Sequence, residues 1–410
     1  MLRTPPRRPR RTAVLFRAAA LAAALAGCSD PGPGPDVGAG PVEVVDRFLT
    51  PAATPVPPAA LAAAERLVRG RVGAEAFPGA ALAVGNRERV QTVEGFGRVG
   101  WDTAAAPVDQ DRTLYDLASL TKVVATTAAV MALVEDGRMD VDAPVRRYLP
   151  EWRGGDKDRV TVRQLLTHTS GARAGAAEIE GETPAAVRRF LLGLPLTLEP
   201  GEDVLYSDLG FVVLWLAAER AAGEPLPRYL RRRVWGPLGM ESTGVGVPTG
   251  CARCAPTMHL EERDAPYAGG SYDEVARRLD GVAGNAGAFS TARDLARFAA
   301  MIANDGRLGS ARVFRRRTVR AFTTPQPGAG TRALGWEVYC REGVVPDREP
   351  CRQVYAFGHT GVTGTSLWVD PVSRTWVVLL ANRTYLPRHE VDMQQLRRRL
   401  FETVTADSLS

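Results

Sequence analysis

The chain has almost no lysine. Lysine and arginine together number 52, yet only Lys122 and Lys157 are lysines, so arginine carries nearly all of the positive charge. Arginine stays protonated in proteins, whereas a buried lysine can lose its proton and act as a base. Lys157 lies in the polar stretch Gly-Gly-Asp-Lys-Asp, where either basic residue would serve, but Lys122 lies among apolar residues. The scarcity of lysine therefore directs attention to Lys122.

Several catalytic and binding signatures are also missing. No Gly-x-Ser-x-Gly elbow occurs, which disfavours a conventional α/β-hydrolase. No His-Glu-x-x-His occurs among the four scattered histidines, which disfavours a metallohydrolase. The net charge of +6 is spread along the chain without zinc-finger spacing or basic-aromatic interleaving, so we expect no nucleic-acid binding. Residues 95–100 match the dinucleotide fingerprint, but a polar loop follows them instead of a helix. We expect no cofactor and no metal.

The first 58 residues are typical of a targeting segment followed by a tether. Residues 3–11 are basic, and residues 13–26 are apolar but too short to span a bilayer stably. The sequence Leu-Ala-Gly-Cys then ends at Cys28 and resembles a bacterial lipobox, which implies a diacylated Cys28 anchored in a membrane. An ordinary signal peptide with a chance cysteine is the alternative. We expect a signal peptide at 1–27, a flexible tether at 28–58 and export from the cytoplasm.

The four remaining cysteines agree with export. In an oxidising compartment we expect two disulfides, Cys251 with Cys254 and Cys340 with Cys351. Zinc bound by all four cysteines is the alternative. A thioredoxin-like motif at Cys251-Ala-Arg-Cys254 is disfavoured because it lies in a loop, with no strand leading into a helix.

Hydrophobic periodicity predicts strands near both ends of a folded domain at 59–405 and helices between them. We expect strands at 80–84, 89–96, 334–340, 365–369 and 375–381, and helices at 59–72, 118–136, 161–166, 184–192, 209–222, 225–233, 291–304 and 389–404. The pattern favours an α+β fold: an antiparallel sheet built from both chain ends, flanked by helices, with a mainly helical lobe inserted at about 114–306. A small-molecule site is expected between the sheet and this lobe.

Ser119 and Lys122 lie at the start of the helix expected at 118–136. They are three residues apart, so both side chains project to the same side. A hydroxyl beside an amine, at the positive end of a helix, is a workable nucleophile and base. Taken alone, the same spacing also fits a helix-start serine and a lysine that extends its ammonium to solvent.

Further motifs follow in order along the chain. They include Leu-Leu-Thr-His-Thr-Ser-Gly at 165–171 and a glycine-rich run ending in Ser-Thr-Ala at 281–292. With them, the chain resembles the penicillin-recognising serine hydrolases, the group of class C β-lactamases, D-alanyl-D-alanine carboxypeptidases and related esterases, over roughly residues 60–400. The resemblance implies a β-lactamase/transpeptidase-like fold. Three motifs are typical of that group. Their counterparts in this chain are Ser119-x-x-Lys122, Tyr206-Ser-Asp208 and His359-Thr360-Gly361.

The resemblance also implies roles in an acyl-enzyme mechanism. Ser119 would attack a carbonyl carbon, and Lys122, Tyr206 or both as a pair would take its proton. An ammonium beside a phenol favours the ionised phenol. The backbone N–H groups of Ser119 and Val362 would bind the oxyanion, and water would release the acyl group.

Substrate contacts are implied for His359, Thr360 and Gly361, which would line the strand side of the cleft. Two simpler interpretations stay open: Tyr206 as a core aromatic residue, and His359 as a turn residue satisfied by the backbone. His168 follows an amphipathic helix and has no part in the implied chemistry, so we expect it to be structural.

Asp208 departs from the group's pattern, which usually has asparagine there. Asparagine donates and accepts hydrogen bonds, whereas an ionised aspartate only accepts. Asp208 would hold Lys122 protonated, shift the role of base towards Tyr206 and repel a carboxylate-bearing substrate. His359, where lysine is common, weakens carboxylate recognition further.

The whole sequence therefore predicts an exported, lipid-anchored serine hydrolase. We expect it to act on a cell-wall D-amino-acid peptide or a small ester rather than as an efficient β-lactamase. The partners are a small-molecule or peptide substrate and the membrane that holds Cys28, and we expect a monomer. The alternative is a catalytically weakened cell-surface lipoprotein that uses the same cleft for binding.

Overall fold

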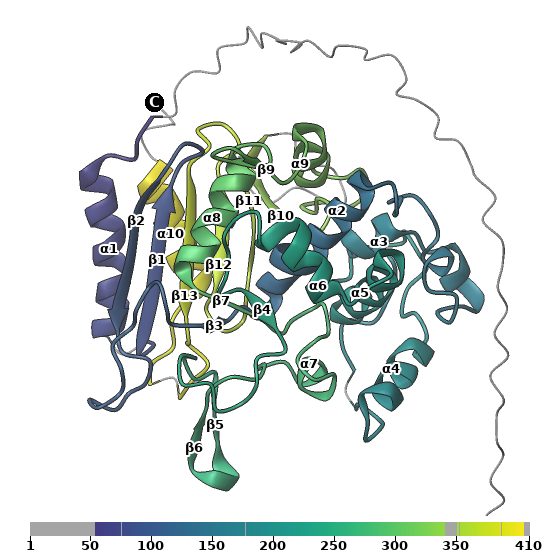
Figure 1. Cartoon of the computed structure of the whole chain (residues 1–410), viewed down its shortest axis with the longest axis horizontal. Helices are drawn as coiled ribbons and strands as arrows, with labels where there is room; N and C mark the ends of the chain where they lie inside the picture. Colours follow the sequence, from purple (N-terminus) through teal and green to yellow (C-terminus); the bar gives the residue numbers. More distant parts are fainter. Residues whose placement is uncertain are drawn as a thin grey trace, which may run out of the picture. The chain divides into compact units, whose positions relative to one another are not determined.

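A six-stranded antiparallel sheet is the central feature of the computed structural model, which describes residues 54–405 except 75, 177, 341–350, 352 and 387 (Figure 1). The strand order is β10-β11-β12-β13-β1-β2. Because β1 pairs with β13, the sheet joins the two ends of the described chain and confirms the expected α+β architecture. The strands are β1 (Gly79–Gly85), β2 (Val90–Gly97), β10 (Glu337–Cys340), β11 (Val354–Thr360), β12 (Ser366–Val369) and β13 (Trp376–Ala381). The expected signal peptide, Cys28 and residues 28–53 of the expected tether lie outside the described residues. The end of the tether was predicted wrongly, because Val56 is buried and exchanges backbone hydrogen bonds with the Gln91 side chain, and Pro58 begins α1.

Helices and short strands make up the rest of the described fold. The α-helices are α1 (Pro58–Gly73), α2 (Ala128–Glu135), α3 (Val162–Leu166), α4 (Pro184–Gly193), α5 (Asp208–Ala222), α6 (Leu226–Leu230), α7 (Glu274–Arg278), α8 (Ala292–Ala303), α9 (Arg316–Thr323) and α10 (Met393–Thr405). The short strands are β3 (Tyr115–Asp116), β4 (Gly244–Val245) and β7 (Ala288–Ser290) in one sheet, and the pairs β5 (Met258–Leu260) with β6 (Ala265–Tyr267) and β8 (Arg307–Leu308) with β9 (Ala311–Arg312).

Both faces of the main sheet are covered by helices, because its central strands are apolar on both sides. Every residue of β1 is buried. Its side chains alternate between two cores, as the pleat of a strand requires. Ala81 and Ala83 pack in the core that includes α8, whereas Leu82 and Val84 pack in the core that includes α1 and α10. Helix α8 therefore covers one face, and α1 with α10 covers the other (Figure 1).

The helix expected at 118–136 forms the core of the helical part. It begins with a 3₁₀ turn at Ala118–Leu120, continues as a π-helical turn at Lys122–Thr127 and ends as α2. Its apolar stretch is long enough to cross a membrane, but it is mostly buried inside the protein. π-Helical turns inside α-helices often mark functional sites. This irregular helix start carries Ser119 and Lys122.

Three local predictions were wrong. Strand β11 was missed, and His359 and Thr360 of the His-Thr-Gly motif are its last two residues. Helix α9 was missed because its sequence is rich in arginine, and its buried side chains reduce to Thr318, Val319 and Phe322. The helix expected at 225–233 is divided into α6 and a π-helical turn at Arg231–Trp235. These errors arise where tertiary packing outweighs the local hydrophobic pattern.

The four cysteines of the described residues form two disulfides. Cys251 is bonded to Cys254, and Cys340 at the end of β10 is bonded to Cys351 just before β11. These are the pairs named from the sequence, and the bonded thiols cannot serve as the four ligands of a zinc ion.

Candidate active site

Ser119 lies in the 3₁₀ turn that opens the central helix, and its side chain is partly exposed. The preceding residue, Ala118, has a φ of +46°, in the left-handed region that residues other than glycine rarely adopt. The Asp116 carboxylate supports this turn by accepting a hydrogen bond from the Ala118 N–H at 2.9 Å. Strained backbone of this kind concentrates at functional sites. The first N–H groups of a helix also lack intrahelical acceptors, so they are free to meet a ligand.

Lys122 is fully buried beside Ser119. Its Nζ donates hydrogen bonds to Ser119 Oγ at 3.1 Å, to Asp208 Oδ1 at 2.6 Å and to the backbone oxygen of Asn285 at 3.0 Å. Burial alone lowers the pKa of Lys122, but the charges of Tyr206 and Asp208 and the hydrogen bonds to them outweigh burial, so the pKa lies above its ordinary value. Lys122 is therefore an ammonium that orients Ser119 and holds its own protons.

The Tyr206-Ser-Asp208 segment leads into α5. Ser207 is the N-cap, and its Oγ accepts a hydrogen bond from the Gly210 N–H at 2.8 Å. Asp208 is thus the first residue of the helix, where the helix dipole favours a carboxylate. The Asp208 side chain is 31% exposed, and the centroid of the Tyr206 ring lies 4.9 Å from Lys122 Nζ. The helix cap therefore places both residues beside Lys122.

His168 supports this segment from within the core. Its ring centroid lies 4.5 Å from that of Tyr206, and its Nδ1 accepts a hydrogen bond from the Ser207 N–H at 3.0 Å. Burial, followed by the positive charges of Arg332 and Lys122, lowers the pKa of His168 well below its ordinary value. The imidazole is therefore neutral, with its proton on Nε2. These contacts fit the structural role expected for His168.

His359 is the second-last residue of β11, and the centroid of its ring lies 6.2 Å from that of Tyr206. Its Nδ1 donates a hydrogen bond to the Thr360 backbone oxygen at 2.8 Å, while its buried Nε2 has no partner among the described residues. Burial, followed by the positive charges of Lys122 and Arg332, lowers the pKa of His359 to about 3. This position therefore carries no positive charge at neutral pH.

The turn after β11 is bonded to the backbone just before Ser119. Thr363 Oγ1 donates to the Asp116 backbone oxygen at 2.7 Å, and Thr365 Oγ1 donates to the Leu117 backbone oxygen at 2.9 Å. These hydrogen bonds hold the turn that carries Ser119 against the sheet and bring the His-Thr-Gly motif to the Ser-x-x-Lys motif.

Gly361 occupies a position that admits no side chain. A Cβ there would lie 2.2 Å from Thr365 Oγ1 and 2.3 Å from the Leu117 backbone oxygen. Arg397 on α10 fixes the turn from the other side by donating to the backbone oxygens of Gly361 and Thr365, at 2.8 and 2.9 Å. The next residue, Val362, is 45% exposed, and its N–H has no acceptor among the described residues. A free backbone donor thus lies in the turn that contacts the Ser119 turn.

The glycine-rich segment at 281–292 closes another side of the site. Asn285 presents its backbone oxygen to Lys122, and the Gly284 oxygen accepts a hydrogen bond from Thr126 Oγ1 at 2.6 Å. Gly284 has a φ of +86°, and a Cβ there would lie 2.4 Å from the Trp215 side chain. The absence of a side chain at Gly284 lets this segment pack against α5 while its backbone oxygens accept hydrogen bonds from Lys122 and Thr126.

Arg332 was missed by the sequence reading. Its guanidinium carbon lies 5.5 Å from the centroid of the Tyr206 ring, so a cation faces the site. The Arg332 guanidinium pairs with the Glu337 carboxylate only at the long distance of 4.0 Å. Arg332 belongs to an irregular segment between α9 and β10, where no motif or periodicity marks a residue. The fold alone brings it to Tyr206.

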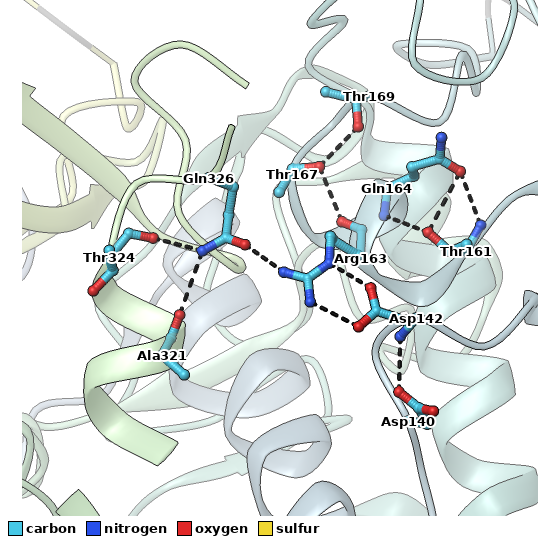
Figure 2. A network of polar contacts seen from close by, with 10 residues as sticks. All are labelled: Asp140, Asp142, Thr161, Arg163, Gln164, Thr167, Thr169, Ala321, Thr324 and Gln326. Atoms are coloured by element: carbon cyan, nitrogen blue, oxygen red, sulfur yellow. Dashed lines mark hydrogen bonds and ion pairs between the residues drawn. The ribbon is translucent and has the colours of Figure 1, made fainter. Parts of the chain in front are cut away.

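Gln326 donates a backbone hydrogen bond to the Arg332 oxygen at 2.9 Å. The Gln326 side chain belongs to a polar network that extends to Arg163 and Asp142 (Figure 2). Arg163 on α3 donates one hydrogen bond to the Gln326 side chain and another to Asp142 Oδ1 at 2.6 Å. Helix α3 leads directly into the Thr-His-Thr-Ser-Gly motif. The same helix therefore positions both His168 and the segment of Arg332.

Replacing His359 with asparagine should change how stability depends on pH. The pKa of His359 is 6.5 in its ordinary state and about 3 in the folded protein, so the unfolded chain binds more protons between these values. The stability that neutral His359 permits is thus present above pH 6.5 and is lost as the pH falls towards 3. The free energy of unfolding of the wild type, minus that of the His359→Asn variant, should fall by at most about 1.4 kcal/mol per pH unit. Urea denaturation between pH 7 and 4.5 measures it, and a pH-independent difference would contradict a neutral, buried His359.

Comparison with known proteins gives the family. The family model described as Beta-lactamase matches residues 64–400. Curated relatives include the “Putative D-alanyl-D-alanine carboxypeptidase” of Salmonella agona (strain SL483) and a protein of the same name from Salmonella typhi. Each is 31% identical to this chain over an alignment of 306 positions, and the match covers 67% of this chain and 70% of the relative.

Solved structures share the fold at lower sequence identity. EstCE1, described as a hydrolase with promiscuous acyltransferase activity, has a TM-score of 0.67 and 21% identity, over 84% of this chain and 98% of its own. A class C beta lactamase from Rhodobacter sphaeroides has a TM-score of 0.65 and 23% identity, and the D-alanine carboxypeptidase AmpC from Burkholderia cenocepacia has 0.65 and 22%. Each of these two matches covers 85% of this chain and 99% of its own. With the family model matching most of its length, this chain belongs to the Beta-lactamase family and is a serine hydrolase.

Proposed function

We propose that the protein hydrolyses the terminal amide bond of a D-amino-acid peptide through an acyl-enzyme on Ser119. The observation that carries the proposal is the buried Lys122 ammonium, 3.1 Å from the Oγ of a serine that follows a strained backbone turn. Relatives named D-alanyl-D-alanine carboxypeptidase support a peptide of this class. A small ester is the second substrate class, because the same attack opens an ester.

The reaction would begin with attack of Ser119 Oγ on the substrate carbonyl carbon. The proton of Ser119 would pass to Tyr206, because Lys122 already holds its protons against Asp208. The N–H groups of Ser119 and Val362 would donate to the oxyanion. Breakage of the carbon–nitrogen bond would release the amine with that proton and leave an ester on Ser119. Water would then hydrolyse the ester with the same groups acting in reverse.

This site differs from the family pattern in the charges that its residues present to a substrate. The carboxylate of Asp208 repels an anionic substrate, and His359 offers no compensating charge because its pKa is lowered to about 3. Arg332 supplies a cation beside Tyr206 from another part of the chain. We propose that Arg332 binds the terminal carboxylate of the peptide.

Two substitutions should move substrate preference in opposite directions. We expect Asp208→Asn to raise the ratio of kcat/KM for an acylated D-alanyl-D-alanine peptide over that for an uncharged p-nitrophenyl ester, by about tenfold, because it removes one repulsive charge. Arg332→Gln should lower the same ratio by about tenfold, because it removes the attractive charge. Release of D-alanine and of nitrophenol gives the two rates. Using the ratio cancels any effect on Ser119 chemistry that both substrates share, so a ratio that neither variant changes would overturn the assignment of Arg332.

The tight contact between Lys122 and Asp208, at 2.6 Å, also favours a second function. If the ammonium cannot leave Asp208, the site would hold its ligand with little turnover, as a binding lipoprotein would. Covalent labelling of Ser119 distinguishes the two, because a binding protein would form no adduct.

Export and lipid anchoring complete the proposal. They are supported by the basic and apolar segments that precede Cys28, and by two disulfides that need an oxidising compartment. A peptide of the cell wall would meet the enzyme on that side of the membrane.

A further inference from the structure

A cavity lies between α4, α5 and the 3₁₀ helix Gly155–Arg159, which carries Lys157. It encloses about 650 Å³, which is within the range of small-molecule sites. Its lining from α5 includes Glu219 and Arg220, whereas Asp208 of the active site begins the same helix. At 1.5 Å per residue, Asp208 and Glu219 are about 16 Å apart along the helix axis. The cavity is therefore distinct from the Ser119 site.

Positive charge predominates in this cation-lined cavity. Five of its lining residues are cationic, and two are carboxylates. Both carboxylates already have partners. Glu151 pairs with Arg220 at 2.8 Å, and Glu219 accepts a hydrogen bond from the Leu226 N–H at 3.1 Å. The cations of the lining are Arg153, Lys157, Arg188, Arg189 and Arg220.

Three of these guanidinium groups have no partner within the part of the chain that the structure describes. Among the described residues, no hydrogen bond or ion pair engages the side chains of Arg153, Arg188 or Arg189. The Nε of Arg188 is also buried without an acceptor. A buried donor without a partner costs free energy, which an anionic ligand would recover. Planar guanidinium groups bind phosphate and carboxylate oxygens in pairs.

Lys157 adds a buried cation to the same cavity. The sequence suggested a polar loop where arginine would serve equally, but the structure buries Lys157 and directs its Nζ to the Leu192 backbone oxygen at 2.8 Å. That oxygen lies near the C-terminal end of α4, where a cation is favourable. Burial lowers the pKa of Lys157. A lysine ammonium has three N–H donors, so hydrogen bonding to Leu192 leaves donors for a ligand.

We propose that the cation-lined cavity binds a small molecule with two anionic groups, either phosphates or carboxylates. Arg188 and Arg189 would bind the anionic groups, and Lys157 would donate a hydrogen bond to one of these groups deeper in the cavity. Leu192 and Leu216 also line it and would contact a short apolar part of the ligand. This site is independent of the reaction at Ser119.

The test is calorimetric titration of the full chain with inorganic pyrophosphate and, separately, with glutarate at low ionic strength. The wild type should bind at least one probe saturably with one site. The double variant Arg188→Gln/Arg189→Gln should bind that probe at least tenfold more weakly. The matched control is Arg317→Gln/Arg399→Gln, which removes the same charge from exposed positions of α9 and α10. Its affinity should stay within twofold of the wild type.

The outcomes separate the proposal from general electrostatic attraction. Binding of pyrophosphate alone identifies a phosphate compound, and binding of glutarate alone identifies a dicarboxylate. No saturable binding of either probe to the wild type would overturn the proposal, as would equal weakening in the control. If circular dichroism shows that the double variant is unfolded, Arg153→Gln/Arg189→Gln replaces it, because both side chains are exposed.

Discussion

Replacing Ser119 with alanine should lower kcat/KM for every substrate of this protein by at least about 10⁴-fold. The nucleophile and its base act as a unit in serine hydrolases, and removal of either typically costs rates of this order. Lys122 Nζ donates to the Ser119 hydroxyl at 3.1 Å, and no other serine among the described residues forms a hydrogen bond with this ammonium. Release of nitrophenol and of D-alanine measures the loss. Ser310→Ala, at an exposed position outside the site, is the control and should leave both rates unchanged.

The Ser119→Ala variant should also stay folded. The Ser119 side chain is partly exposed and contributes one hydrogen bond to Lys122. We expect a change in the free energy of unfolding of about 1 kcal/mol or less. A variant that keeps more than about one tenth of the wild-type rate would show that another group is the nucleophile.

Replacing Lys122 should lower the acylation rate by about 10³-fold, whichever residue takes its place. Methionine removes the ammonium that orients Ser119. Arginine keeps the charge, but its larger planar group does not fit a fully buried position whose three acceptors suit one small ammonium. Stopped-flow rates with the nitrophenyl ester measure the loss. An arginine variant with wild-type activity would contradict the role given to Lys122.

The free energy of unfolding gives an independent check on the ion pair between Lys122 and Asp208. Lys122→Met leaves the Asp208 carboxylate without its partner, whereas Lys122→Met/Asp208→Asn removes both charges. Removal of one partner of a buried ion pair costs more than removal of both. In urea unfolding, the double variant should therefore be more stable than Lys122→Met alone.

Much of the fold could be predicted from local sequence pattern. Both β1 and β13 are short apolar runs whose residues are buried on both faces, so periodicity reveals them and places helices on each side. The motifs with fixed spacing were also visible, because Ser119 and Lys122 interact within one helix turn and Ser207 caps the helix that begins with Asp208.

Other features depend on contacts between distant segments. Arg332 faces Tyr206 from a segment that Gln326 and Arg163 connect to α3, and no local pattern encodes these contacts. Lys157 looks like a loop residue in the sequence and is buried only because α4 packs over it. The left-handed φ of Ala118 carries no residue signal, since alanine rarely adopts it. Such features follow from the assembled fold.

The most direct test of the central claim is intact-mass measurement of the protein after incubation with a fluorophosphonate and, separately, with a penicillin. We expect a single covalent adduct of the fluorophosphonate on the wild type and none on Ser119→Ala. A penicillin adduct that also depends on Ser119 would extend the claim to β-lactam recognition, whereas its absence would favour an esterase or amidase. Failure of the wild type to form either adduct would contradict the acyl-enzyme mechanism and leave the binding lipoprotein as the better account.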